Sequence, residues 1–159
     1  MDPEERVKQV AMYRDGYAAV VEVLKKITPE EAGRRPGPGR WSVREIVHHL
    51  ADSEMTAAVR LRLLVAQDRP TIYGYDQDQF AERLYYDRPY ETSLELFRWA
   101  REATAEILER LSPEEWARDG VHSEVGRFGV DEWLATYSGH AHKHARQIRE
   151  ARDAAAKAT

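Results

Sequence analysis

The feature that most constrains the fold is a long connection between two strongly patterned helices. Residues 42–67 and 92–111 carry apolar side chains at helical spacing, whereas residues 68–91 between them are rich in Tyr, Asp and Pro. A connection of this length can run back along a helix of about 25 residues, which spans about 38 Å. We therefore predict that the two helices it joins are parallel.

Two further helices complete the predicted set. The first follows Asp2, which can cap a helix, and Pro3, which suits the first helical turn. The last begins near Gly129 and runs past Ile148, with apolar residues on one side. Four long helices and a long connection between the second and the third predict an all-α four-helix bundle, and we expect residues 1–159 to form one domain.

Shorter signals refine this outline. Ser42–Glu45 and Thr92–Glu95 both match a capping box, in which side chains and backbone N–H groups pair at the start of a helix. Residues 76–84 within the long connection are compatible with a short helix. Residues 119–129 contain three Gly and alternate weakly, which indicates a loop or a small hairpin.

Composition and charge exclude several classes of partner and chemistry. The net charge is −4 and no basic stripe stands out, so nucleic acid and anionic membrane surfaces are poor partners. The chain has no cysteine, which excludes disulfides and thiolate metal sites. The N-terminus lacks signal-peptide character, and no apolar run approaches about 20 residues. We expect a cytoplasmic protein that acts on a small molecule.

Histidine spacing in two helices suggests a metal site. His140 and His144 are four apart on or beside the inward side of the last helix, the spacing at which one helix offers two imidazoles to one ion. His142 lies about 200° away from His140 and should face water. A third ligand must come from elsewhere, and periodicity gives His49 only a slight edge over His48. Buried hydrogen-bonded histidines remain an equal alternative on spacing alone.

Two motifs resemble signatures of the DinB/YfiT-like superfamily of metal-dependent hydrolases. Residues 41–54 read WSVREIVHHLADSE and resemble its second-helix signature, and residues 137–148 follow YxxHxxxHxxQI and resemble its last-helix signature. The loop over residues 70–81 and the GRFG of residues 126–129 are similar to the YfiT branch in particular. The resemblance covers nearly the whole chain, about residues 5–150.

This resemblance implies a fold and a site. The fold is a bundle with up-down-down-up order, and the site is one divalent ion, zinc or nickel, bound by His49, His140 and His144. The family ligand immediately precedes Leu-Ala-Asp, which selects His49 over His48. Relatives commonly carry histidine where this chain has Lys143, a position that is not carried over as a ligand. The resemblance also implies a homodimer.

The functional expectation is a metal-dependent hydrolase that uses an open position on the ion. One alternative is a metal-dependent S-transferase whose cofactor is a low-molecular-weight thiol of the bacillithiol type. Another is a module without enzymatic activity, in which the metal stabilises the bundle or a dimer. The absence of cysteine fits each of these alternatives, because any thiol would come from outside the chain.

No catalytic residue is identified from the sequence. Asp52 and Glu54 lie one turn beyond His49 and are weak candidates for a general base, with Glu54 expected to face water. Arg60 is expected to pair with Glu residues of a neighbouring helix. We expect His122 at the surface.

Overall fold

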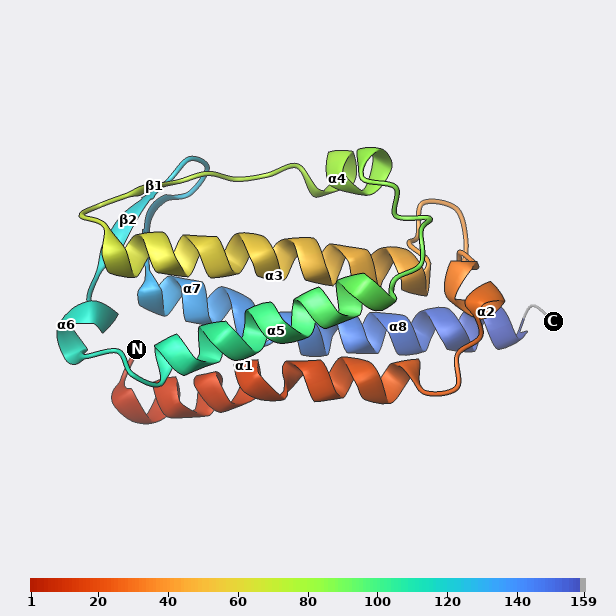
Figure 1. Ribbon diagram of the computed structural model, residues 1–159, viewed down its shortest axis with the longest axis horizontal. Helices are drawn as coiled ribbons and strands as arrows, with labels where there is room; N and C mark the ends of the chain where they lie inside the picture. Colours follow the sequence, from red (N-terminus) through yellow and green to blue (C-terminus); the bar gives the residue numbers. More distant parts are fainter. Residues whose placement is uncertain (158–159) are drawn as a thin grey trace.

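The computed structural model describes residues 1–157, and its four long helices form the predicted bundle (Figure 1). The second and third long helices run in the same direction, and the first and last run opposite to them, which confirms the up-down-down-up order. α3 packs most extensively on α5, and α1 on α8. The long helices are α1 (Pro3–Leu24), α3 (Val43–Ala66), α5 (Glu91–Leu108) and a fourth that is divided into α7 (Val130–Tyr137) and α8 (His140–Lys157).

Short elements join the long helices at the ends of the bundle. They include a small sheet with the strand order β1-β2-β3, in which β1 pairs parallel to β2 and β2 pairs antiparallel to β3. Gly126, with φ of 79°, lies at the turn of the β2–β3 hairpin, a conformation that favours glycine. The helices are α2 (Pro29–Gly33), α4 (Gln77–Arg83) and α6 (Pro113–Trp116), and the strands are β1 (Thr71–Ile72), β2 (Asp119–His122) and β3 (Gly126–Gly129).

The connection from α3 to α5 runs back along the outside of α3 and contains α4 (Figure 1). Its start is held by β1, and its end by side chains of α3. His48 is fully buried and its ring nitrogens lie 2.8 Å from Ser93 Oγ and 3.0 Å from the Arg88 carbonyl. The Tyr86 hydroxyl donates to Asp52 at 2.7 Å. Buried hydrogen bonds therefore fix the crossover, which the sequence predicted only from its length.

The helix starts agree with the sequence in one case and differ in another. Ser42 and Glu45 form the predicted capping box at the start of α3. The box predicted from Thr92 to Glu95 is wrong, because α5 already begins at Glu91 and its N-cap, Tyr90, makes no side-chain bond.

The last helix is interrupted rather than continuous. Residues 138 and 139 form a turn between α7 and α8, after which the helical hydrogen bonding resumes from the Gly139 carbonyl to the Lys143 N–H at 3.0 Å. Adjacent Ser and Gly are common at such breaks. Because the break precedes His140, the i, i+4 relation of His140 and His144 is preserved within α8.

A polar layer separates two apolar parts of the core. One apolar cluster surrounds Trp133 and the other surrounds Phe97. Between them, the buried carboxylate of Glu54 forms an ion pair with the buried guanidinium of Arg101 at 2.8 Å and accepts a hydrogen bond from the Tyr13 hydroxyl. The expectation that Glu54 faces water was therefore wrong, since the charge of Arg101 offsets the cost of burying its carboxylate.

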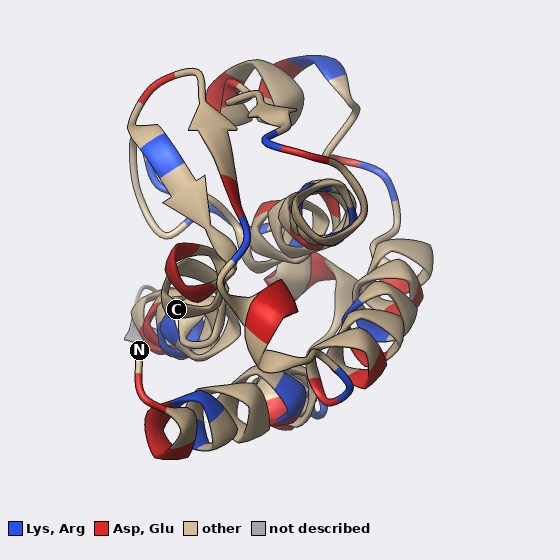
Figure 2. Ribbon diagram, turned by 90° about the vertical axis from the view of Figure 1, so that its left-hand side faces the viewer, with Lys and Arg blue, Asp and Glu red and all other residues tan. Residues whose placement is uncertain are grey.

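Among the described residues, Glu45 and Asp52 are the other buried carboxylates, and the remaining Asp, Glu, Lys and Arg side chains lie outside the core. Figure 2, viewed from one end of the bundle, shows acidic and basic residues mixed over the helices rather than separated by sign. Within residues 1–157, no helix is both long and apolar enough to span a membrane.

Gly16 allows a close approach between α1 and its neighbours, and this generates a prediction. A Cβ atom there would lie 2.7 Å from Ala141 Cβ and 2.9 Å from Arg101 Nη1. We expect Gly16→Ala to lower the free energy of unfolding by about 1–2 kcal/mol, because the overpacking outweighs the gain in helix propensity. Urea titration followed by circular dichroism measures this.

Gly37→Ala is the matched control, because no atom lies within 4 Å of the corresponding Cβ position. It should change the free energy of unfolding by less than about 0.5 kcal/mol. Equal stability of the two variants would contradict the close packing at Gly16.

Candidate metal centre

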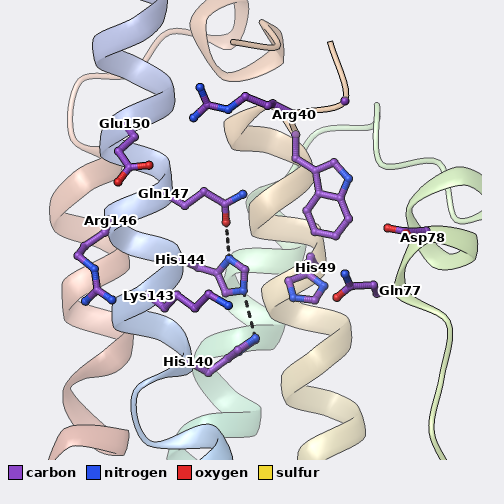
Figure 3. Close-up of a pocket in the computed structure, with 12 residues that line it drawn as sticks. Arg40, His49, Gln77, Asp78, His140, Lys143, His144, Arg146, Gln147 and Glu150 are labelled. Atoms are coloured by element: carbon purple, nitrogen blue, oxygen red, sulfur yellow. Dashed lines mark hydrogen bonds between the residues drawn. The ribbon is translucent and has the colours of Figure 1, made fainter. Parts of the chain in front are cut away.

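Three histidines from two helices meet on one side of the bundle (Figure 3). His49 comes from α3, and His140 and His144 from α8. One side-chain nitrogen of each lies within 4.8 Å of the other two, and the Nε2 atoms of His140 and His144 are 3.1 Å apart. The structure thus brings together the three residues that the resemblance selected.

The neighbouring histidines lie elsewhere. His48 is buried in the hydrogen bonds that hold the crossover, and its ring packs against Tyr86. His142 is half-buried on another side of α8, where its Nε2 lies 3.0 Å from the Met12 carbonyl of α1. Adjacent helix positions differ by about 100°, so neighbours in sequence face different parts of the bundle.

Gln147 fixes the tautomer of one candidate ligand. His144 Nδ1 lies 2.7 Å from the Gln147 side-chain oxygen, which can only accept a hydrogen bond. With the proton on Nδ1, the Nε2 atom of His144 carries a lone pair directed toward His140. Hydrogen bonding of the outer ring nitrogen is the usual way in which a protein orients a metal-ligating imidazole.

Burial keeps these imidazoles neutral. Desolvation, followed by the charge of His144, lowers the pKa of His49 from 6.5 to about 3. Desolvation also lowers the pKa of His140 to about 2, with smaller contributions from His144, His49 and Arg101. The pKa of His144 is lowered by burial as well. Neutral imidazole is the form that binds metals, so the lone pairs are available at neutral pH.

The geometry of the group fits a divalent ion. Metal–imidazole bonds of about 2.0–2.1 Å in a tetrahedral arrangement place two ligand nitrogens about 3.4 Å apart, close to the 3.1 Å between His140 and His144. His49 Nδ1 is buried without a hydrogen-bond partner. Within residues 1–157, no other His or carboxylate joins the group. Three nitrogen ligands without a fourth protein ligand are typical of an open, catalytic type of site.

The histidines line a pocket of about 620 Å³, which lies within the range of small-molecule sites. Trp41, which precedes α3, forms one wall, and the centroid of its ring lies 5.0 Å from that of His49. Gln77 and Asp78 of α4 also line it, beyond His49 as seen from α8, so the crossover contributes directly to the site (Figure 3). Lys143 lines it from α8. The sequence contained no signal for these walls, because tertiary contacts alone join the segments.

Other candidate residues are engaged in structural contacts. Asp52 accepts from Tyr86 and Glu54 pairs with Arg101. Arg60 does not pair with a glutamate, contrary to expectation: its Nη1 donates to the Tyr137 hydroxyl at 2.8 Å and its Nη2 to the Tyr73 carbonyl.

His122 is also placed differently from the expectation. It is buried rather than at the surface, and its Nδ1 accepts the Glu124 N–H at 3.2 Å. The centroid of its ring lies 5.5 Å from that of Phe128 across the hairpin. The alternation of buried and exposed residues along β2, a weak signal in the sequence, explains why His122 points inward.

Comparison with known proteins finds relatives that carry the same descriptive name. One protein of Oceanobacillus iheyensis is 36% identical over 110 residues, which are 69% of this chain and 64% of that protein. A second from the same organism is 28% identical over 148 residues, which are 93% of this chain and 84% of that protein. Both carry the name "Putative metal-dependent hydrolase". The chain thus spans less than two thirds of the first relative.

Solved structures share the fold. YfiT from Bacillus subtilis, a four-helix bundle of unusual topology, matches with a TM-score of 0.88 and 24% identity, over 95% of this chain and 87% of that one. The four-helix bundle protein TT2238 matches with a TM-score of 0.58 and 21% identity, over 92% of this chain and 98% of that one. The sequence profile of the DinB superfamily matches residues 12–148, which include all three candidate ligands, and the chain therefore belongs to the DinB superfamily.

Proposed function

We propose that this protein is a metal-dependent hydrolase whose ion is held by His49, His140 and His144. The observation that carries the proposal is the group of three neutral imidazoles with one side open to a pocket and no fourth protein ligand within residues 1–157. The names of the relatives support it, and YfiT is itself called "a probable metal-dependent hydrolase". Imidazole ligands suit zinc and nickel, which are the ions we propose.

The chemistry follows from the charge of the site. When bound by these three neutral ligands, a divalent ion would keep its full charge and would supply Lewis-acid chemistry to a substrate, water or thiol in the pocket. The protein orients the ligands of the ion, since Gln147 holds the His144 ring in the tautomer whose Nε2 can bind a metal. Trp41 borders the pocket next to His49 with its aromatic ring.

The proposed reaction does not rely on a carboxylate base from α3. Asp52 accepts a hydrogen bond from Tyr86, and Glu54 is bound to Arg101 and Tyr13 in the core. Neither lines the pocket, where the carboxylates are Asp78 and Glu150. We infer that activation of the nucleophile depends mainly on the ion.

Thiol transfer is the second candidate function. A pocket of about 620 Å³ has room for a low-molecular-weight thiol beside an electrophilic substrate. In that case the thiol would bind the ion as thiolate and replace water as the nucleophile. A non-enzymatic site that stabilises the bundle or a dimer is less consistent with three ligands, because structural zinc sites are usually closed by a fourth.

Metal content tests the ligand set. We expect the wild-type protein to bind about one zinc or nickel ion per chain, and His49→Ala, His140→Ala and His144→Ala each to lose most of it. Elemental analysis after dialysis measures this. His142→Ala is the matched control on α8 and should retain the ion, since its ring contacts Met12 instead. Equal metal content in all variants would contradict the site.

Turnover separates the two reactions. Metal-loaded protein is incubated with a panel of esters, amides and alkylating electrophiles, with and without a bacillithiol-type thiol. Product formation without thiol supports hydrolysis, and product formation only with thiol supports transfer. In either case His144→Ala should reduce turnover at least about 100-fold, while His142→Ala should not. Equal activity of metal-free and metal-loaded protein would refute both reactions.

The pH dependence of stability tests the neutrality of the group in metal-free protein. An unfolded His49 gains a proton near pH 6.5, whereas the folded residue resists protonation down to about pH 3. The unfolded state therefore binds more protons in this window, and stability falls as pH decreases through it, by about 1.4 kcal/mol per pH unit for a fully buried histidine.

His49→Phe should make this slope shallower between pH 6.5 and pH 4, because the variant has no titrating group there. Urea unfolding at intervals of half a pH unit, with chelator present, gives the slope. An unchanged slope would show that His49 titrates alike in the folded and unfolded chains.

A further inference from the structure

We propose that Lys143 binds an anionic group of the substrate, so that this site selects small carboxylic acids. The inference rests on the proposed metal site and names the class of molecule that it takes. It assigns Lys143 as a residue that positions the substrate and determines specificity, in addition to the three histidines.

Lys143 is placed to act on the same molecule as the histidines. It lines the pocket as an exposed residue, and its side chain extends across α8 toward His144 and His140 (Figure 3). Lys143 directly precedes His144 and follows His140 by three positions, so α8 presents its ammonium group and two of the three imidazoles to the same pocket.

Among the residues that the structure describes, the charge of Lys143 has no partner. The residues three and four positions away in the sequence are Gly139, His140, Arg146 and Gln147, none of which is acidic. Within residues 1–157, no hydrogen bond or ion pair joins its ammonium group to another side chain. A surface lysine without a partner is ordinary, but one beside three histidines of a metal site is not.

Electrostatics explains why an anion belongs there. A lysine ammonium near a divalent ion would be repelled by it, although solvent weakens this repulsion because the Lys143 side chain is exposed. An anion between the two positive charges converts this repulsion into two attractions. A molecule that presents its reacting group to the ion and a carboxylate to Lys143 is therefore favoured over a neutral molecule of the same shape.

The other charges of the pocket do not cancel this effect. Arg40 and Arg146 are basic, whereas Asp78 and Glu150 are acidic, so with Lys143 the lining carries three positive and two negative charges. Figure 3 shows Arg146 directed away from the histidines, and Arg40 extending across the rim toward α8 near Gln147 and Glu150. Lys143 is thus the cation that faces the histidines.

A ligand series on cobalt-loaded protein tests the inference without measuring activity. Cobalt(II) content is measured first, and binding is then followed by the near-ultraviolet absorption of a thiolate on cobalt. The probes are 3-mercaptopropionate and the neutral 3-mercapto-1-propanol, which differ in the carboxylate. The wild-type protein should bind the acid at least about fivefold more tightly than the alcohol.

The variants separate the role of Lys143 from general effects of charge. The Lys143→Gln variant should lose most of the preference for the acid. The Lys143→Arg variant should keep the preference, because it keeps the positive charge. Arg149→Gln is the matched control, because Arg149 is an exposed cation of the same helix that does not line the pocket. It should retain the preference.

Two results would overturn the inference separately from the proposed function. If cobalt binds but Lys143→Gln keeps the wild-type preference, then the carboxylate is recognised by the ion alone and the role of Lys143 is wrong. If the wild-type protein shows no preference, the site does not select acids. If no cobalt binds, the metal site itself is wrong and the inference falls with it.

Discussion

The bundle depends on one buried interaction at its centre, the ion pair between Glu54 of α3 and Arg101 of α5. Tyr13 of α1 completes it, since its hydroxyl donates to Glu54 and its carbonyl accepts from Arg101. Buried charges must be paired, so this ion pair favours the relative register of the three helices in which its groups meet. Because Gly16 has no side chain, there is room beside α1 for the guanidinium of Arg101 and for the close approach of α8. The same arrangement determines where α3 and α8 face each other, and Arg101 contributes to the lowered pKa of His140.

The crossover determines which surface of α3 remains available for the site. By returning along the outside of α3, the chain places α5 parallel to α3, on the side where His48 meets Ser93. His49, about 100° away, is left to face α8. The crossover then contributes α4 to the wall of the pocket. A connection that is needed for the topology thus also encloses the site.

Much of the fold could be predicted from local patterns, and the failures have physical causes. The capping box of α3 and the spacing of His140 and His144 are local, and both are present. The start of α5 was predicted wrongly, because the helix extends beyond the matching motif. The position of Glu54 was also predicted wrongly, since the distant Arg101 decides whether a carboxylate can be buried. β1 has only two residues and gave no pattern to detect.

The sequence by itself determined the four helices, the parallel pair and the two histidines of α8, because helical periodicity and chain length are properties of the local sequence. The choice of His49 over His48 came from a family resemblance, and only the tertiary structure shows why the two differ: one faces the crossover and the other faces α8. The pocket, and the unpaired charge of Lys143 within it, were decided by tertiary structure alone. Its walls come from segments that are distant in sequence, and their contacts exist only once the helices have packed.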